Sequence, residues 1–279
     1  MSEPLVTIVT ATYNDARYIH LPIESVLAQP YENFEMIIVD DGSTDPRSLE
    51  ILTGIRHPKI TLVRGENRGL PGARNTGIRA GRGDYILPLD ADDKITPVCL
   101  QRSVEALETN PDTAMVYGDL GLFGTDDRVI PAGAFNTYRL ALGNYLPVGS
   151  VFRREAWESV GGYTETMLGF EDWEFWLKLV EKGWKFRKVD GVMFLHHQHG
   201  RSMWTDSRPI YKKIIAQIRS LHPELYTKES LRRLREENGI TWFEDLVYRI
   251  PLPLRRTLGR SPLRRLLRVV KALGLYRDL

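Results

Sequence analysis

The sequence predicts an α/β protein in which a mostly parallel, partly mixed sheet is flanked by helices and followed by a helical C-terminal extension. Two observations carry this prediction. Short runs of apolar and β-branched residues, typical of strands covered on both faces, alternate with segments whose apolar residues recur at helical spacing. Acidic and polar residues collect where the apolar runs stop, as they do at the carboxyl ends of strands in open α/β sheets.

The parallel strands are predicted in the first third of the chain. Apolar runs at residues 5–11, 34–39, 60–63 and 84–89 are predicted as buried strands, and residues 16–29 and 46–55 as helices. A segment rich in Gly and Arg, residues 67–77, leads into a further helix. Strands that alternate with helices in this way are joined by right-handed crossovers, which place them parallel in one sheet.

The second half predicts a mixed continuation of the sheet. Thr96 as N-cap and Pro97 as the first helical residue predict a helix that runs to about Glu108. A strand at residues 113–120 is followed by a hairpin over residues 121–131, which would bring antiparallel strands into the sheet. The remaining predictions are a mobile loop over 132–147, strands at 149–153 and 184–195, and helices at 172–182 and 209–221.

Length and composition bound the organisation of the chain. Its 279 residues suffice for one large domain and an appendage, and we divide it into a domain over residues 1–222 and a basic helical extension over residues 223–279. Cys99 is the single cysteine, which excludes an intrachain disulfide and a cysteine-based zinc site. No apolar run reaches about 18 residues and the N-terminus lacks a signal-peptide pattern, so we expect a cytoplasmic location.

The end of the chain is strongly basic. Residues 249–279 hold nine basic side chains and one acidic one, which leaves −6 on the rest of a chain whose net charge is +2. Within residues 263–273, leucine and arginine recur at helical spacing. Such a helix can lie peripherally on an anionic membrane, here the inner face of the cell membrane, or it can pack on the folded body with solvated arginines. Aromatic residues do not interleave with the arginine clusters, so nucleic acid is not expected as a partner.

The chain is organised around residues 85–93, where an apolar run ends abruptly in Asp90, Asp92 and Asp93. A buried strand would deliver these carboxylates to the edge of the sheet where open α/β folds bind their ligands. Their mutual repulsion can be offset by a cation or by a hydrogen-bonding ligand, and Mn²⁺ or Mg²⁺ takes carboxylate oxygens while leaving positions open for phosphate. A metal–diphosphate site is therefore the first hypothesis, and a polar turn after the strand is the alternative.

Two further segments carry candidate ligands for a nucleotide. Asp40 and Asp41 end the second predicted strand, where they can hydrogen-bond ribose hydroxyls or a base N–H, or simply cap the next helix. In residues 67–77, glycines allow close approach of the backbone, and Arg68 and Arg74 offer planar donors to phosphate or to a base edge. The alternative for this segment is a capped helix start with a solvated arginine.

Two clusters in the second half carry candidate catalytic or metal-binding groups. Glu171 and Asp172 lie beside aromatic residues, where a carboxylate with a raised pKa can act as a general base. Alternatively, these acids stabilise the positive end of a helix dipole. His196, His197 and His199 can ligate a metal or can be structural residues.

Taken together, these motifs resemble those of the family 2 glycosyltransferases over about residues 5–205. The motifs are Val6–Asn14, Ile38–Asp45, Asn67–Gly77, Asp90–Asp93, Ser150–Arg154 with Gly161–Tyr163, and Gly169–Glu174. The resemblance implies the GT-A fold and an inverting enzyme that moves a sugar from a nucleotide-diphosphate donor, with UDP-sugar favoured. The implied acceptor is a hydroxyl of a glycan or a lipid-linked glycan of the cell envelope.

The resemblance also implies which residues hold the donor. They are Ala11, Tyr13, Asp41, Arg74, Asp90 and Ala91. Ala11 and Tyr13 would line the base, and Asp41 would contact it. Arg74 would lie near the base or the diphosphate, and Asp90 would face the ribose. Ala11 stands where the family usually has proline, a change that a backbone contact survives.

The remaining implied roles concern the metal and the base. Asp92 would ligate Mn²⁺ or Mg²⁺, and His199 stands where related enzymes often place a metal- or phosphate-contacting histidine, with His197 as the competing choice. Asp172 would be the catalytic base, with Glu171 beside it near the acceptor.

Two other functions compete with this interpretation. A sugar nucleotidyltransferase shares the sheet and the metal–nucleotide chemistry, but it needs a phosphate loop rich in Gly, Arg and Lys after the first strand. Residues 11–14, Ala-Thr-Tyr-Asn, stand at that place instead. A non-catalytic nucleotide-sugar-binding protein would not need both Asp92 and Asp172.

Overall fold

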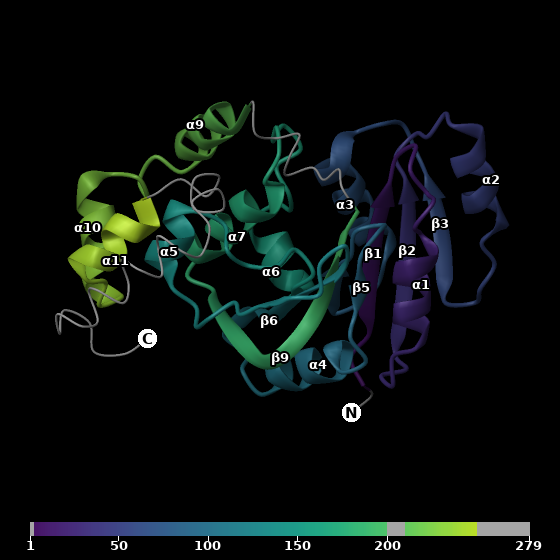
Figure 1. The fold of residues 1–279 in the computed structure, drawn as a ribbon, viewed down its shortest axis with the longest axis horizontal. Helices are drawn as coiled ribbons and strands as arrows, with labels where there is room; N and C mark the ends of the chain where they lie inside the picture. Colours follow the sequence, from purple (N-terminus) through teal and green to yellow (C-terminus); the bar gives the residue numbers. More distant parts are fainter. Residues whose placement is uncertain (1–2, 200–209, 250–279) are drawn as a thin grey trace.

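The computed structural model describes residues 3–199 and 210–249, and one curved sheet runs through them (Figure 1). Its strands are β1 (Val6–Thr12), β2 (Phe34–Asp40), β3 (Ile60–Arg64), β4 (Tyr85–Pro88), β5 (Lys94–Ile95), β6 (Thr113–Gly124), β7 (Val129–Ile130), β8 (Val151–Arg153) and β9 (Lys185–Gln198). The order across the sheet is β3-β2-β1-β4-β8-β6-β9-β5, with β7 paired to β6. The first four strands are parallel, whereas β8 is antiparallel to both of its neighbours. The predicted mixed sheet is confirmed.

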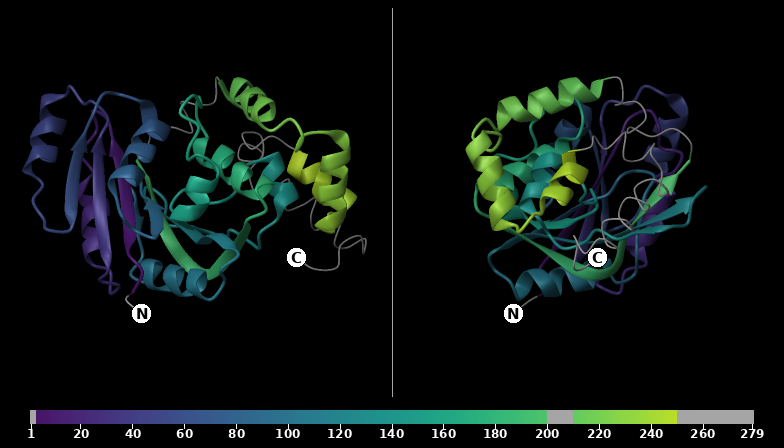
Figure 2. Two further views of the ribbon diagram at one scale, coloured as in Figure 1. Left: turned by 180° about the vertical axis from the view of Figure 1, so that it is seen from behind. Right: turned by 60° about the vertical axis from the view of Figure 1, so that its left-hand side comes forward.

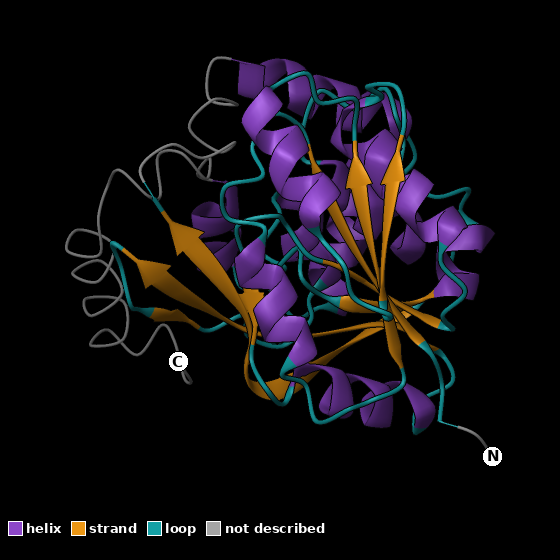
Figure 3. Ribbon diagram, turned by 90° about the vertical axis from the view of Figure 1, so that its right-hand side faces the viewer, coloured by secondary structure: helices purple, strands orange, loops and turns teal. Residues whose placement is uncertain are grey.

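Helices cover both faces of this sheet (Figures 2 and 3). They are α1 (His20–Leu27), α2 (Pro46–Gly54), α3 (Gly69–Ala80), α4 (Cys99–Glu108), α5 (Thr137–Leu142), α6 (Arg154–Ser159), α7 (Glu171–Glu181), α9 (Tyr211–Leu221), α10 (Lys228–Glu237) and α11 (Trp242–Arg249). Helices α1, α2 and α4 contribute to one apolar core, and α5, α6, α7 and α9 to another. In Figure 1, α10 and α11 lie at the end of the molecule opposite β3 and α2.

The alternation of strand side chains explains the two cores. Ile8 of β1 packs with Met36 and Ile38 of β2 in the core that contains α1, α2 and α4, whereas the next residue, Val9, packs in the other core. Both faces of β1 are almost completely buried, with Ile8 0% and Val9 1% exposed. Successive residues of a strand point to opposite faces, so a strand with helices on both sides is a continuous apolar run.

The predicted helix start at Thr96 and Pro97 is wrong, since Thr96 hydrogen-bonds to the backbone of β9 and the helix starts later. Short strand β5 precedes them and pairs with β9, a pairing that the sequence did not predict. The backbone N–H of Thr96 donates to the carbonyl of Met193, and its hydroxyl donates to the carbonyl of Val192 over 2.8 Å. Helix α4 begins at Cys99, with Val98 rather than Thr96 at the N-cap position and no side-chain hydrogen bond to cap it.

The segment predicted as a mobile loop, residues 132–147, contains helix α5. Asn136 caps this helix, since its side-chain oxygen accepts from the backbone N–H of Arg139 over 2.8 Å. Tyr138 and Leu140 are fully buried. Six residues are too few to establish a helical period in sequence, so this element depended on tertiary packing that the sequence pattern could not show.

The C-terminal extension is described in part. Helix α9, at the end of the predicted domain, has Ile214 and Ile218 fully buried in the same core as α7, and α10 and α11 belong to the extension. The predicted basic amphipathic helix over residues 263–273 lies outside the described residues, and the boundary after residue 222 stays a prediction. Within residues 3–199 and 210–249, no helix combines the length and the apolar character needed to cross a bilayer.

Helix α3 lies unusually close to the sheet because of Gly77. A Cβ at this position would lie 2.4 Å from Cγ1 of Val9 in β1 and 3.0 Å from Cγ2 of Val39 in β2. Gly77 was predicted as part of a ligand-approaching segment, but its lack of a side chain serves helix–sheet packing. The close approach matters for function because α3 also carries Arg74.

Replacement of Gly77 by Ala is expected to lower the melting temperature by a few degrees. Overpacking of a filled core costs about 1–3 kcal/mol, which outweighs the gain of up to about 1 kcal/mol from Ala over Gly in a helix. Differential scanning calorimetry measures the change. Gly54→Ala in α2 is the matched control, because no atom lies within 4 Å of its added Cβ. A Gly77→Ala protein that melts at or above the wild-type temperature would contradict the packing argument.

Candidate active site

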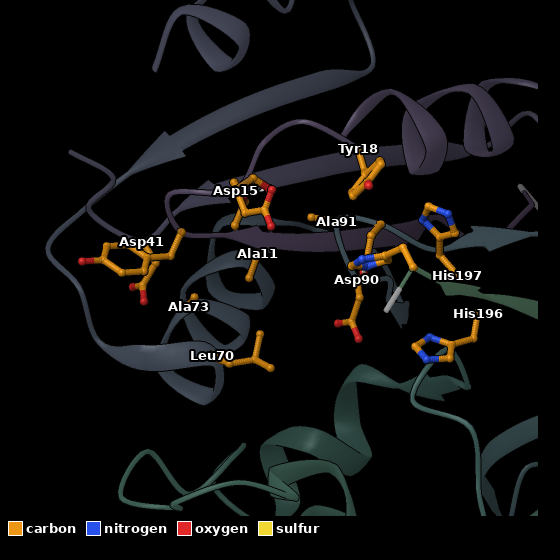
Figure 4. Close-up of a pocket in the computed structure, with 14 residues that line it drawn as sticks. Ala11, Asp15, Tyr18, Asp41, Leu70, Ala73, Asp90, Ala91, His196 and His197 are labelled. Carbon is orange, nitrogen blue, oxygen red and sulfur yellow. Dashed lines mark hydrogen bonds and ion pairs between the residues drawn. The ribbon is translucent and has the colours of Figure 1, made fainter. Parts of the chain in front are cut away.

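A cavity of about 360 Å³ opens at the carboxyl ends of β1, β2 and β4 (Figure 4). It is lined by Ala11, Thr12, Tyr13, Asp15, Tyr18, Asp41, Leu70, Ala73, Asp90, Ala91, Asp92, His196, His197 and His199. Asp41 lies at one end and the histidines lie at the other. Of the predicted donor and metal residues, all except Arg74 line this cavity.

The two acids after β2 have different environments. Asp41 lines the cavity, and its carboxylate accepts from the backbone N–H of Arg68 over 2.9 Å. Burial raises the pKa of Asp41 above its usual value. Asp40 is instead held inside the fold, where it accepts from the backbone N–H of Ser43 over 2.8 Å and pairs with Arg64 over 3.2 Å. Asp41 is therefore the acid of this pair that can contact a ligand.

Tyr13 gives this end of the cavity an exposed aromatic face. Its side chain is 50% exposed, and the backbone next to it is fixed by Asn14. Asn14 has a left-handed φ of 52°, and its side-chain oxygen accepts from the backbone N–H groups of Thr44 and Asp45. An exposed ring on a fixed backbone can stack on a planar base.

Arg74 is buried between two carboxylates. Its guanidinium lies 2.7 Å from Oδ1 of Asp90, which lines the cavity, and 2.5 Å from Oε1 of Glu171, which opens helix α7. Burial disfavours the charged form, but Asp90 and Glu171 raise the pKa of Arg74 above its ordinary value. The ion pairs join the cavity to the start of α7. The predicted contact of Arg74 with the donor stays a prediction.

Asp93 is a structural residue at the end of the acidic stretch. Its side chain is fully buried, and it accepts from the backbone N–H of His197 over 2.8 Å and lies 3.0 Å from Nδ1 of His196. Burial raises the pKa of Asp93 to about 7. These contacts fix the end of β9 against the residues that follow β4.

Asp92 and His199 face each other at the histidine end of the cavity. Oδ2 of Asp92 and Nε2 of His199 lie 2.7 Å apart. Neighbouring ligands of an octahedral ion at about 2.1 Å lie about 3 Å apart, so this pair fits one edge of an Mn²⁺ or Mg²⁺ coordination shell. In the part of the chain that the structure describes, no three His, Cys, Asp or Glu side chains form a complete metal site. A bound ion would therefore need further ligands from the substrate or water.

The three histidines have separate roles in the structure. His196 contacts Asp93; burial acts to lower its pKa, but the hydrogen bond to Asp93 and the negative charges of the neighbouring acids together raise it above the ordinary value. His197 stacks on Phe123 with ring centroids 4.6 Å apart, and burial lowers its pKa. Only His199 of the three contacts Asp92 in the described residues, which favours it over His197 as the metal ligand.

Asp172 occupies the first turn of α7. Its Oδ1 accepts from the backbone N–H of Trp173 over 2.8 Å, and its Oδ2 accepts from Nδ2 of Asn144 over 2.7 Å. Burial and the negative charge of Glu171 raise the pKa of Asp172 to about 7. Phe170, just before the helix, adopts a left-handed φ of 56°, a costly conformation that helps to set the direction of this first turn.

Sequence reasoning missed three residues of this region. Tyr18 and Asp15 line the cavity, and Asn144 contacts Asp172. Tyr18 could have been predicted from its position, because it follows shortly after the first strand, where the chain crosses the ligand-binding edge of the sheet. Asn144 could not have been predicted, because the segment that carries it shows no period in sequence.

The fold matches solved glycosyltransferase structures. TarS residues 1–349 from S. aureus, solved in complex with UDP-GlcNAc, align over 90% of this chain and 77% of that chain with a TM-score of 0.66 and 16% identity. The mannosyltransferase PcManGT from Pyrobaculum calidifontis, in complex with GDP-Man and Mn²⁺, aligns over 99% of this chain and 82% of that chain with a TM-score of 0.61 and 22% identity. The expected GT-A fold is confirmed.

Similarities in sequence agree with the fold. The chain is 28% identical to a chondroitin synthase of Escherichia coli over 250 residues, which cover 86% of this chain and 36% of that protein. It is 28% identical to a hyaluronan synthase of Pasteurella multocida over 216 residues, or 75% of this chain and 22% of that protein. The chain thus spans about a third or less of the length of these relatives. Residues 7–156 match the family described as glycosyl transferase family 2, and the chain belongs to that family.

Proposed function

We propose that this chain transfers a sugar from a nucleotide-diphosphate donor to an acceptor hydroxyl, with inversion at the anomeric carbon. The observation that carries the proposal is the buried Arg74, which contacts Asp90 of the cavity over 2.7 Å and Glu171 next to Asp172 over 2.5 Å. A donor cavity and a carboxylate of raised pKa are thereby held in one site. Membership of glycosyl transferase family 2 supports the same reaction class.

The cavity suits a nucleotide that enters with its base toward Asp41. Tyr13 offers an aromatic face, and Asp41 offers an acceptor for a base N–H. Asp90 and Ala91 lie between Asp41 and the histidines in Figure 4, where the ribose and diphosphate would follow. A UDP-sugar is the favoured donor, since the TarS structure contains UDP-GlcNAc, although the structure of PcManGT contains GDP-Man.

Asp92 and His199 would hold the divalent ion. The presence of Mn²⁺ in the PcManGT structure supports this choice. When bound, such an ion stabilises the negative charge of the departing diphosphate. Asp93 supports the pair indirectly, because it anchors the backbone at His197, two residues before His199.

Asp172 would act as the general base. Its raised pKa suits a carboxylate that takes a proton from an acceptor hydroxyl near neutral pH. The oxygen then attacks the anomeric carbon from the face opposite the leaving diphosphate. A single displacement of this kind inverts the configuration, as the family resemblance implies.

The acceptor is proposed to be a glycan or a lipid-linked glycan of the cell envelope. The names of the polysaccharide synthases among the relatives support a glycan acceptor. Peripheral contact with the inner face of the membrane through residues 249–279 stays a prediction. Neither rival function gains support, because no phosphate loop follows β1 and because both Asp92 and Asp172 occupy the site.

Replacement of Asp172 by Asn should lower kcat on the order of 10²–10⁴-fold and leave donor binding nearly unchanged, because only the proton acceptor is lost. The rate of sugar transfer to water or to a glycan acceptor is measured from the nucleoside diphosphate released. Donor binding is measured by calorimetry. Asp190→Asn, at an exposed position, is the control. Near-full activity of Asp172→Asn would remove this residue as the base.

The rate should depend on the protonation of Asp172. With a pKa of about 7, the base is charged above that pH and protonated below it, so kcat/KM should fall about tenfold per unit as the pH drops below 7. Rates between pH 5 and pH 9 measure this limb. A rate that stays nearly constant from pH 9 down to pH 5, as expected for an aspartate with an ordinary pKa near 4, would argue against a buried carboxylate as the base.

Replacement of Asp92 by Asn should abolish the Mn²⁺-dependent part of UDP binding. His199→Ala should weaken the Mn²⁺-dependent affinity for UDP. Loss of a residue that only hydrogen-bonds to a metal ligand lowers metal affinity roughly 10–100-fold, and loss of a ligand should cost at least as much. His197→Ala is the matched comparison and should cost clearly less, because His197 lines the cavity but stacks on Phe123 and makes no contact with Asp92 in the described residues. Titration calorimetry with UDP, with and without Mn²⁺, gives the dissociation constant of UDP for each variant. Equal losses in the two histidine variants would refute the assignment of His199.

A further inference from the structure

Asn144 contacts the carboxylate that the proposed function assigns as the base. It lies two residues after the end of α5, and its Nδ2 donates to Oδ2 of Asp172 over 2.7 Å. The other carboxylate oxygen accepts from the backbone N–H of Trp173 over 2.8 Å. Each oxygen of Asp172 therefore has one fixed hydrogen bond, and each retains a lone pair that can accept a proton from a substrate.

The orientation of the Asn144 amide is determined by its surroundings. Its Oδ1 accepts from the backbone N–H of Leu146 over 3.1 Å. A backbone N–H can only donate, so the oxygen must face Leu146 and the amide nitrogen must face Asp172. The reverse orientation would place N–H against N–H and oxygen against a carboxylate. Asn144 is thus held as a donor to the base.

The segment that carries Asn144 is tied to the helix that carries Asp172. The indole N–H of Trp173 donates to the carbonyl of Leu140 in α5 over 2.7 Å. The hydroxyl of Tyr226 donates to the carbonyl of Ala141, the next residue of α5, over 2.8 Å. These bonds fix α5 on both sides, so the position of Asn144 relative to α7 is set by the fold.

We propose that Asn144 is the positioning residue of the catalytic base. By donating to Oδ2, it holds the carboxylate of Asp172 in one rotamer and stabilises its charged form. This inference rests on the proposed function for the role of Asp172, but the contact itself does not depend on it.

The charges around Asp172 set the expected direction of the effect. Glu171 is adjacent on α7, Arg74 approaches from α3, and Tyr163 lies in the segment before α7. Burial and Glu171 raise the pKa of Asp172, whereas Arg74 and the hydrogen bonds from Trp173 and Asn144 lower it. Loss of the Asn144 donor should therefore raise this pKa further and keep the base protonated over a wider pH range.

The direct test is the titration of Asp172 in the full-length chain. The ¹³C carboxyl resonance of Asp172, identified by its absence in Asp172→Asn, is followed from pH 5 to pH 10. Asn144→Ala should move the midpoint upward by about one unit, since a hydrogen bond to a charged group is worth about that much. Asn144→Asp, which keeps the shape but adds a negative charge, should move it further.

Asn136→Ala is the matched control. Asn136 caps the same helix but does not contact Asp172, so this variant perturbs α5 without removing the donor. It should lower the melting temperature and leave the midpoint of Asp172 in place. An unchanged midpoint in both Asn144 variants, or an equal shift in Asn136→Ala, would overturn the proposal.

Activity separates this inference from the proposed function. Activity is measured as the release of UDP from a UDP-sugar. In Asn144→Ala, the pH below which kcat/KM falls should move upward by the same amount as the titration midpoint of Asp172, so that activity is low at pH 7 and recovers at pH 9. A rate lowered equally at every pH would indicate a merely structural role. If Asp172→Asn keeps full activity, the base assignment fails whatever the titration shows.

Discussion

The buried guanidinium of Arg74 is the interaction on which the rest of the site depends. A charge removed from water is stable only when it is paired, and here two carboxylates from distant parts of the chain pair with it. Loss of either carboxylate would leave this buried charge less fully compensated, so replacement of Asp90 or of Glu171 alone is expected to destabilise the site. The close packing of α3, which Gly77 permits, brings Arg74 to the place where both acids reach it.

Three neighbouring acids after β4 serve three purposes. Asp90 pairs with Arg74, Asp92 faces His199, and Asp93 is buried against the end of β9. A cation is therefore not required to offset the charges of all three acids, because the protein itself compensates the carboxylates of Asp90 and Asp93. The metal hypothesis narrows to Asp92, whose single described partner is an imidazole that can itself ligate a metal.

The parts of the fold that are buried on both faces were predictable from sequence. The predicted bounds of β1 and β2 differ from the structure by one residue, because their apolar patterns record burial directly. Elements defined by distant partners were not predictable, such as β5 and α5. The same limit applies to the site. The apolar pattern could not distinguish Asp40, held inside by Arg64, from Asp41 in the cavity, which only the family resemblance singled out; nothing in the sequence indicated Asn144.

The connection between β4 and β5 has a consequence for how this site can vary. Residues 89–93 join two strands that are each paired within the sheet, so both ends of the connection are anchored. Within it, Asp92 faces the cavity and Asp93 faces the interior. Loss or gain of a single residue would move Asp92 away from the cavity or Asp93 away from its buried partners. The number of residues in this connection is therefore as restricted as their chemistry, and insertions should be tolerated elsewhere on the cavity rim first.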